Sequence, residues 1–497
     1  MTIRKILILL VIMSFIVTFI NCSHATKEPN NDIAENEQIE SGVQLNFSDE
    51  YITTAEFVFM MADVVNEVSI QHEIESVNQY VQGTEEEKEE ELISRGQAAT
   101  ILVKILEELG EDGYPYDIWK YQQNIIDIHN REESLILNIL KVYVKGLMEI
   151  DAKGRFNVGG GITKEEVKSI RQRIIEPDKR KIPMWISPEF EEKIAIEELT
   201  VPQGVFFSGE QVYANIILQN VKDFTETLWI GYSFQDQNKK WYDVPAVPIT
   251  LNPYNAVSKS LVWDIPEEMM TGKYRVVLAV WDKSPDEHDA VRIAHGEVAD
   301  GLMLYTTQEM FDAFNDAAWH KSTSRLGRSR LQKENVKIKE GRLVIRLPAN
   351  SVDGGEIRTQ DLQSFGAYEI RMKLPDAPSS ITGFFLYKAP DYDHEIDIEV
   401  FNNERGELLL TTYANNKKQH EYVGELTFDP TEKFHNYRIE YYPEYVAFYI
   451  DNRLIQKWTD GYSDEPMYLM VNSWYPNWLP GQPPEIDKYL YIEWIRY

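Results

Sequence analysis

Three acidic residues alternate with apolar residues in the stretch DHEIDIEVFNN, which covers residues 393–403. Successive side chains of a β-strand point to opposite faces, so Glu395, Asp397 and Glu399 share one face and the apolar residues share the other. Like charges placed side by side on a sheet repel, so such a row is unfavourable unless it has a use. The row leaves three interpretations: a solvated strand face, a metal site or a catalytic carboxylate pair.

The spacing of the outer two acids favours catalysis. A strand rises about 3.3 Å per residue, which places the α-carbons of Glu395 and Glu399 about 13 Å apart. Side chains that lean inward over a curved sheet bring the carboxyl groups to about 5–6 Å, close to the separation in retaining glycosidases. Asp397 lies between them and can shift the proton affinity of one Glu through a hydrogen bond. A calcium ion would instead favour acids and backbone carbonyls on a loop.

About 195 residues at the C-terminus resemble glycoside hydrolase family 16, and most closely its bacterial β-1,3-1,4-glucanases, the lichenases. Besides the acidic row, three stretches carry the resemblance: residues 354–390, residues 434–455 (FHNYRIEYYPEYVAFYIDNRLI) and residues 467–481 (MYLMVNSWYPNWLPG). They occur in the order that the family has. The resemblance implies a β-jelly roll with a substrate cleft on its concave face.

The resemblance also implies roles for individual residues. Glu395 matches the nucleophile, Glu399 the general acid/base and Asp397 their helper. A second group matches the residues that contact sugar in the family, namely Glu356, Arg358, Phe385, Tyr387, Asn472, Trp474 and Trp478. Phe385 could equally belong to the core, whereas the loop position of Trp478 makes that alternative less suitable.

Several positions depart from the lichenase pattern. Asp393 stands in place of a Trp and His394 in place of an Asp, and the Tyr and Asn of an early loop have no clear match in residues 321–330, KSTSRLGRSR. The acidic motif lacks the one-residue insertion that accompanies β-1,3-glucan cleavage, which favours the lichenase-like branch. These departures affect sugar-binding positions, so they leave the polysaccharide open and the chemistry intact.

No cofactor is required for this chemistry, and no metal is expected among the catalytic residues. The family often binds a structural calcium ion on its convex side. Glu493 stands where an Asp would help to bind it. A structural calcium ion is therefore a further expectation from the resemblance.

The N-terminus indicates export. Arg4 and Lys5 precede an apolar run over residues 6–20, which suits a signal peptide over residues 1–21. Cys22, the only cysteine, follows at once, and the stretch FINC resembles a bacterial lipobox. We expect lipidation of Cys22 and an anchor in the membrane, with plain secretion or an uncleaved anchor as alternatives. Residues 22–48 are polar and aperiodic, which predicts a flexible tether.

Residues 49–178 show helical periodicity. Residues 120–176 resemble a surface-layer homology repeat, a family that binds cell-wall polysaccharide, and two weaker copies precede them. The segments that would bind the polymer are residues 53–56, 94–97 and 163–166, and only the second keeps the family's Arg, as Arg95. The region can alternatively be a helical module that has lost its ligand.

The remaining chain changes to a period of two residues. Residues 185–302 predict an immunoglobulin-like β-sandwich, either a spacer or a carbohydrate-binding module that uses Trp229, Trp241 or Trp281. Residues 303–497 predict one large domain of two packed sheets, with a helical pattern only at residues 307–314. The expected class is multidomain and mainly β, with helices at the N-terminal end.

The net charge argues against a nucleic-acid partner. The chain of 497 residues has a formal charge of −31, so a nucleic-acid partner is not expected. The sequence as a whole predicts an extracellular, surface-anchored endo-β-glucanase that acts by a retaining double displacement. A transglycosylase that remodels wall or exopolysaccharide glycans and a non-catalytic carbohydrate-binding protein are the alternatives.

Overall fold

The structure is a computed structural model that describes residues 51–68 and 91–497. The predicted signal peptide, the tether and Cys22 lie outside the described residues. The chain divides into the units Met1–Ser48 and Asp49–Tyr497. Strands predominate in the second unit, which confirms the mainly β class. In the described ranges, no helix is long and apolar enough to cross a bilayer.

The N-terminal part of the second unit is helical, as the periodicity predicts. Its helices are α2 (Thr54–Val68), α4 (Arg95–Glu108), α5 (Glu133–Val144) and α6 (Lys164–Ile175), with short 3₁₀ helices η2 (Ile118–Asn124) and η3 (Pro177–Lys179). Ser94 and Thr163 cap α4 and α6, because each hydroxyl accepts a hydrogen bond from the backbone N–H three residues later.

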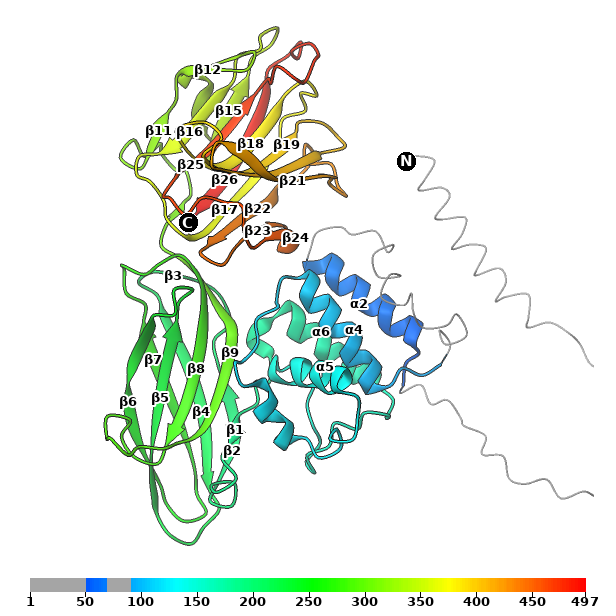
Figure 1. Ribbon diagram of the computed structural model, residues 1–497, viewed down its shortest axis with the longest axis vertical. Helices are drawn as coiled ribbons and strands as arrows, with labels where there is room; N and C mark the ends of the chain where they lie inside the picture. Colours follow the sequence, from blue (N-terminus) through cyan, green and yellow to red (C-terminus); the bar gives the residue numbers. More distant parts are fainter. Residues whose placement is uncertain (1–50, 69–90) are drawn as a thin grey trace, which may run out of the picture. The chain divides into compact units, whose positions relative to one another are not determined.

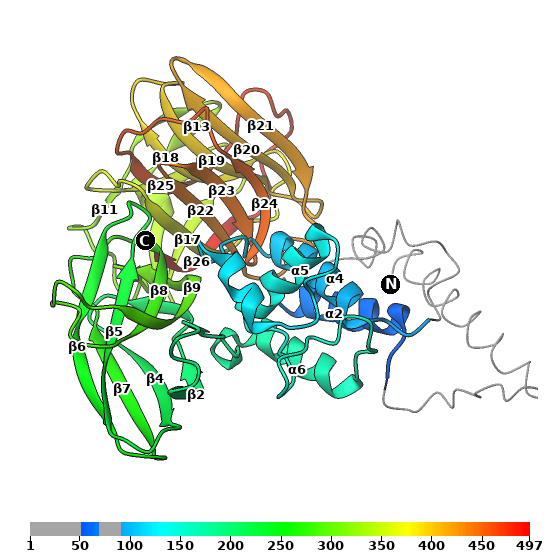
Figure 2. The ribbon, with the colours of Figure 1, turned by 60° about the horizontal axis from the view of Figure 1, so that its bottom comes forward.

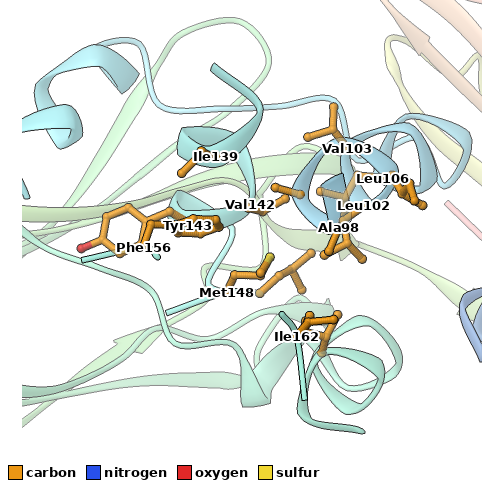
Figure 3. Close-up of a cluster of buried hydrophobic side chains, with 14 of the residues drawn as sticks. Ala98, Leu102, Val103, Leu106, Ile139, Val142, Tyr143, Met148, Phe156 and Ile162 are labelled. Carbon is orange, nitrogen blue, oxygen red and sulfur yellow. The ribbon is translucent and has the colours of Figure 1, made fainter. Parts of the chain in front are cut away.

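This region has its own apolar core. Leu102 and Leu106 of α4 pack with Ile139 and Val142 of α5 (Figure 3). Ile162, which precedes α6 in the sequence, belongs to the same cluster. All five side chains are fully buried. The spacing of three and four residues within each helix is the amphipathic pattern that sequence periodicity reveals.

Arg95, the Arg that matches the polysaccharide-binding segment, is turned inward. Its Nε donates to the carbonyl oxygen of Phe156 at 2.6 Å and its Nη2 to that of Glu149 at 2.7 Å. Nη1 is paired with the carboxylate of Glu166. The guanidinium thus links the start of α4 to the loop before α6 and to α6 itself.

The middle part of the chain is a sandwich of two β-sheets around one core. The strands of the larger sheet are β1 (Trp185–Ile186), β3 (Gly204–Phe207), β5 (Glu226–Gln235), β6 (Trp241–Leu251), β8 (Gly272–Trp281) and β9 (Arg292–Tyr305). Those of the smaller sheet are β2 (Ile194–Thr200), β4 (Gln211–Asn220) and β7 (Ala256–Asp264). The immunoglobulin-like class of this sandwich stays a prediction, and β9 runs past residue 302 to Tyr305.

The C-terminal part also consists of two packed sheets (Figure 1). One sheet contains β10 (Gln308–Glu309), β14 (Val336–Lys339), β15 (Arg342–Leu347), β17 (Gly366–Lys373), β22 (His435–Tyr442), β23 (Tyr445–Ile450), β24 (Arg453–Trp458) and β26 (Lys488–Arg496). The other, which we call the cleft sheet, contains β11 (Trp319–Lys321), β16 (Gly355–Thr359), β18 (Ile381–Lys388), β19 (His394–Phe401), β20 (Glu407–Ala414), β21 (Lys417–Glu425) and β25 (Tyr468–Trp474). A hairpin of β12 (Ser324–Leu326) and β13 (Ser329–Leu331) stands apart, followed by the 3₁₀ helix η4 (Lys333–Asn335).

The strand order of the cleft sheet is β11-β16-β25-β18-β19-β20-β21, and all its pairs are antiparallel. Figure 2 shows β25, β18, β19 and β20 side by side. Apolar side chains on the inner face of this sheet, such as Phe384 and Ile398, pack with Ile370 and Ile439 of the other sheet. The sheet therefore has one face in the core and one face free for a site.

Residues 307–314 are not helical. Gln308 and Glu309 form β10, which pairs with β26 near the C-terminus, and Phe311 is fully buried with a left-handed backbone. Pairing with a strand almost 190 residues later decides the conformation, and a local pattern contains no information on it.

Candidate active site

The acidic row lies where the alternation of β19 predicts. Ile396, Ile398 and Val400 are fully buried in the core. Glu395, Asp397 and Glu399, on the opposite face, line a cleft of about 420 Å³. The solvated-face interpretation does not hold, because Asp397 is only 5% exposed.

Register across the cleft sheet brings further side chains to the acids. Glu395 pairs with Tyr387 on one side and with Tyr413 on the other. Asp397 pairs with Phe385 and Thr411 in the next row. Because residues paired across a sheet point to the same face, each acid has a defined neighbour on both flanking strands.

The third row contains a glycine. Glu399 pairs with Gly383, Gly383 pairs with Asn472, and Asn472 pairs with Glu356 on the far side. A Cβ atom at Gly383 would lie only 2.8 Å from Oδ1 of Asn472. The side chain of Asn472 therefore occupies the space over Gly383, which a residue with a Cβ atom would take from it.

Most of the residues predicted to contact sugar do line the cleft. They are Glu356, Phe385, Tyr387, Asn472, Trp474 and Trp478. Phe385 is 9% exposed and faces the cleft, while its neighbour Phe384 takes the core position. The structure thus resolves the alternative left open for Phe385.

Arg358 is the exception among the predicted residues, since it is absent from the cleft lining. Its guanidinium lies over the ring of Tyr468, 4.3 Å from the centroid, and Nη1 donates to the backbone carbonyl of Thr359. The preference of a guanidinium for an aromatic face explains this orientation. A role for Arg358 in sugar binding stays a prediction.

Seven lining residues were not predicted: Ser324, Leu326, Leu331, Asp391, Tyr392, Tyr413 and Met470. Tyr413 comes from β20, so only the cross-strand register reveals it, whereas Met470 follows from the alternation within β25 that also places Asn472 and Trp474. Ser324 and Leu326 belong to the early loop in which the lichenase Tyr and Asn have no clear match. At this rim, the cleft has a small and an apolar side chain.

Two histidines near the site have structural partners. Nδ1 of His394 lies 2.6 Å from Oγ of Ser463, on the face opposite the acids. Nδ1 of His435 lies 2.7 Å from Oδ2 of Asp451, and its ring stacks on Phe428. The side chain of His394 therefore lies on the face of β19 opposite the cleft, and His435 is buried between Asp451 and Phe428.

Burial controls the electrostatics of the acidic row. It raises the pKa of Glu395 to about 8, with further contributions from the charges of Glu399 and Asp391. Burial raises the pKa of Glu399 to about 7. The pKa of Asp397 is well above its ordinary value for the same reason, and the neighbouring charges add to it, although a hydrogen bond from Thr411 opposes the shift. The three carboxyl groups therefore retain protons between them near neutral pH.

A further carboxyl group, that of Glu356, is buried on the other side of Asn472 in the cleft sheet. Glu356 accepts a hydrogen bond from Nδ2 of Asn472 at 3.1 Å, and burial raises the pKa of Glu356. Oδ1 of Asn472 is buried and has no hydrogen-bond partner among the described residues. An unpaired acceptor in a cleft is a suitable contact for a hydroxyl group of a ligand.

Comparison with known proteins agrees with this geometry. Residues 326–496 match the family model described as glycosyl hydrolases family 16. These residues form a family 16 domain. The C-terminal part of the chain is thus a glycoside hydrolase domain, as the motifs predict, and the fold it contains is the expected two-sheet jelly roll.

Three known proteins are each similar to a part of this chain. The xylanase/beta-glucanase of Ruminococcus flavefaciens is 29% identical over 151 residues, which are 29% of this chain and 19% of that protein. The beta-glucanase of Bacillus subtilis strain 168 is 28% identical over 203 residues, 38% of this chain and 84% of that protein. A solved prokaryotic lichenase from a mouse hindgut metagenome is 26% identical, covers 38% of this chain and 97% of its own, and has a TM-score of 0.36.

The family 16 domain does not offer the expected calcium ligand. Oε2 of Glu493 lies 2.8 Å from Nε of Arg371, and Oε1 lies 3.3 Å from Nη2 of Arg342. Both carboxylate oxygens are engaged by guanidinium groups, which repel a cation. Within the described ranges, no group of three or more His, Cys, Asp or Glu residues could hold a metal ion. The residues present therefore do not fit a structural calcium ion at Glu493.

Proposed function

We propose that the chain is an extracellular, surface-anchored endo-β-glucanase that hydrolyses β-1,3-1,4-glucan or a related β-glucan with retention of configuration. The row of Glu395, Asp397 and Glu399 on the cleft face is the observation that supports this most strongly. The relatives described as beta-glucanases support the choice of substrate class.

The reaction proceeds through two displacements. The carboxylate of Glu395 attacks the anomeric carbon, the glycosidic C–O bond breaks, and Glu399 gives its proton to the departing oxygen. Water then attacks the glycosyl ester, Glu399 takes the proton from that water, and Glu395 leaves as a carboxylate. Two inversions at one carbon give net retention.

The raised pKa of Glu399 suits its role as an acid, whereas the raised pKa of Glu395 makes the reactive form, with Glu395 ionised and Glu399 protonated, a minor one near neutral pH. Glu399 needs a proton for the first step, and burial raises its pKa to about 7. The negative charge on Glu395 disappears when the ester forms, so the proton affinity of Glu399 falls and the group can act as a base. Asp397, which accepts a hydrogen bond from Thr411, stays between the two and modulates their proton sharing.

The charge of the cleft favours an uncharged polysaccharide. Its lining includes the acids Glu356, Asp391, Glu395, Asp397 and Glu399. In the part of the chain that the structure describes, none of the lining residues is Lys, Arg or His. A sulfated or uronic-acid polymer would be repelled there, whereas a neutral glucan presents hydroxyl groups to the carboxylates and apolar ring faces to the aromatic side chains.

A substrate panel tests the function. The chain is incubated with barley β-glucan, laminarin, carrageenan and agarose, and the products are separated by length. We expect a rapid fall in viscosity and mixed oligosaccharides from barley β-glucan, with no products from carrageenan. Cleavage of carrageenan or agarose alone would contradict the proposed substrate class.

The alternatives give different results in the same assay. A transglycosylase would yield products longer than the added oligosaccharide acceptor, because sugar replaces water in the second step. A non-catalytic carbohydrate-binding protein would bind a glucan without new reducing ends. The buried carboxyl groups argue against the second alternative, since a lectin has no use for two carboxyls with raised pKa values.

Residues 49–178 are proposed to bind a cell-wall polymer. A cleft of about 300 Å³ supports this, lined by Arg95, Glu149, Glu166 and Arg173 among others. The region has a core of its own, so the fragment 49–178 can be mixed with isolated cell walls. Retention above that of an unrelated acidic protein is the expected result, and equal retention would reduce the region to a spacer.

A further inference from the structure

Arg328 lies in the turn of the β12–β13 hairpin, at the rim of the cleft, and its guanidinium is committed to backbone carbonyl groups. Nη2 donates to the carbonyl oxygens of Leu479 at 2.7 Å and Ser379 at 3.0 Å. Nη1 donates to that of Gly481 at 2.8 Å, and Nε to that of Pro476 at 3.1 Å. We call these four hydrogen bonds from the Arg328 side chain to backbone carbonyl groups the clamp.

Three of these acceptors belong to one segment, residues 475–487, which connects β25 to β26 without regular secondary structure. Trp478, at 54% exposure, is carried by that segment between the clamped carbonyl groups. The backbone N–H of Arg328 also donates to the carbonyl of Tyr475 at 2.9 Å, directly after β25. Arg328 therefore fixes the segment on both sides of Trp478.

The position of Trp478 relative to the acids follows from β19. Phe401 continues the acidic row two residues beyond Glu399, about 7 Å along the strand. The ring of Trp478 packs on Phe401 with the centroids 5.7 Å apart. Trp478 thus lies beyond Glu399 and away from Glu395, so a sugar ring stacked on it is a neighbour of the ring that Glu395 attacks.

We propose that Arg328 is a positioning residue that fixes Trp478 as a stacking platform for a sugar ring next to the cleaved unit. The proposal rests on the glucan-binding function proposed above. An exposed indole on an unfixed loop must lose conformational entropy when it binds, and the clamp removes that cost in advance. An Arg is suited to this task because its planar fork reaches several acceptors at once, whereas the ammonium group of a Lys cannot.

Kinetics of the full chain test the proposal. Arg328→Ala and Trp478→Ala are each compared with wild type on barley β-glucan and on a dinitrophenyl β-glycoside of a single glucose unit. We expect each substitution to raise KM for the polymer by up to about tenfold, the span of one lost aromatic contact, with kcat nearly unchanged. Turnover of the short substrate should fall less than turnover of the polymer in both variants, and Arg328→Lys should behave like Arg328→Ala.

The double variant distinguishes positioning from other roles. If Arg328 acts through Trp478, adding Arg328→Ala to Trp478→Ala should change KM no further. Additive effects would overturn the proposal, as would an equal loss on the short substrate. Arg330→Ala is the matched control, because Arg330 is an exposed Arg on the same hairpin outside the cleft lining.

A binding measurement separates this proposal from the proposed hydrolysis. Titration with a mixed-linkage glucan tetrasaccharide, followed by tryptophan fluorescence, requires no turnover. Weaker binding by Arg328→Ala and Trp478→Ala, but not by Arg330→Ala, is expected even if wild type released no products. Equal binding by all four proteins would overturn the role of Arg328, whether or not the polymer is cleaved.

Discussion

The hydroxyl group of Tyr387 donates a hydrogen bond to Oδ1 of Asp391, and this bond holds a further carboxylate beside Glu395, the proposed nucleophile. Tyr387 is the register partner of Glu395, so Asp391 lies at the same end of the cleft. The charge of Asp391 is one of the causes that raise the pKa of Glu395. A residue on the loop before β19 thereby influences the protonation of the catalytic row.

The first prediction concerns pH. Activity requires an ionised Glu395 and a protonated Glu399, whose pKa values are raised to about 8 and about 7. Both groups are protonated well below this range and both are ionised well above it, so kcat/KM should peak between about pH 7 and 8. Asp391→Asn removes a charge that favours the protonated form of Glu395, so the pKa of Glu395 should fall and the pH optimum should move to lower pH. Glu404→Gln, on an exposed turn outside the cleft lining, is the control, and an unchanged Asp391→Asn profile would contradict the assigned influence.

The acid/base role of Glu399 predicts a dependence on the leaving group. Glu399→Ala should lower polymer hydrolysis by about 10²–10⁴-fold, the usual contribution of general acid–base catalysis. Dinitrophenyl glycosides need little protonation, so much of their turnover should remain. Glu395→Ala should abolish turnover of both substrates, and azide should restore it with inverted stereochemistry. Equal losses on both substrates in Glu399→Ala would exclude an acid role for Glu399.

The lack of a side chain at Gly383 should be required for binding, because it leaves room for the side chain of Asn472. A methyl group there would lie 2.8 Å from Oδ1 of Asn472, beside Glu399. We expect Gly383→Ala to lower kcat/KM on β-glucan by about tenfold or more, which corresponds to about 1.4 kcal/mol. The thermal unfolding midpoint serves as the control, because the substitution changes the cleft floor and not the core. Wild-type kinetics in this variant would mean that sugar does not approach Asn472.

The proposed membrane attachment depends on Cys22, which lies outside the described ranges. The lone Cys22 directly after an apolar run predicts a lipid-modified N-terminus. In detergent phase separation of extracts from an expressing bacterium, wild type should enter the detergent phase and Cys22→Ser the aqueous phase. If both proteins stay in the aqueous phase, the chain is secreted without a lipid.

The sequence predicts those parts of the site that depend on local pattern. The alternation in β19 is enough to place Glu395, Asp397 and Glu399 on one face. Tyr413 could not be predicted in the same way, because its proximity to Glu395 depends on the register between β19 and β20. Arg358 illustrates a second limit, since its side chain turns to Tyr468, a neighbour that only the sheet order provides.

The cause of the raised pKa of Glu399 is a third point at which the structure adds information. The spacing of the acids predicts that a hydrogen bond from Asp397 shifts the proton affinity of one Glu, whereas burial raises the pKa of Glu399 in the folded chain. The depth of a side chain depends on how two sheets pack and on the surrounding aromatic residues. Neither is encoded in the spacing of the acids.

The stereochemistry of the first product tests the central claim most directly. Proton NMR is recorded from the first minutes of β-glucan hydrolysis by wild type, before mutarotation equilibrates the new reducing ends. A double displacement through Glu395 predicts that the β-anomer appears first and the α-anomer only later. Initial release of the α-anomer would mean a single displacement by water, and the assignment of Glu395 as the nucleophile would be wrong.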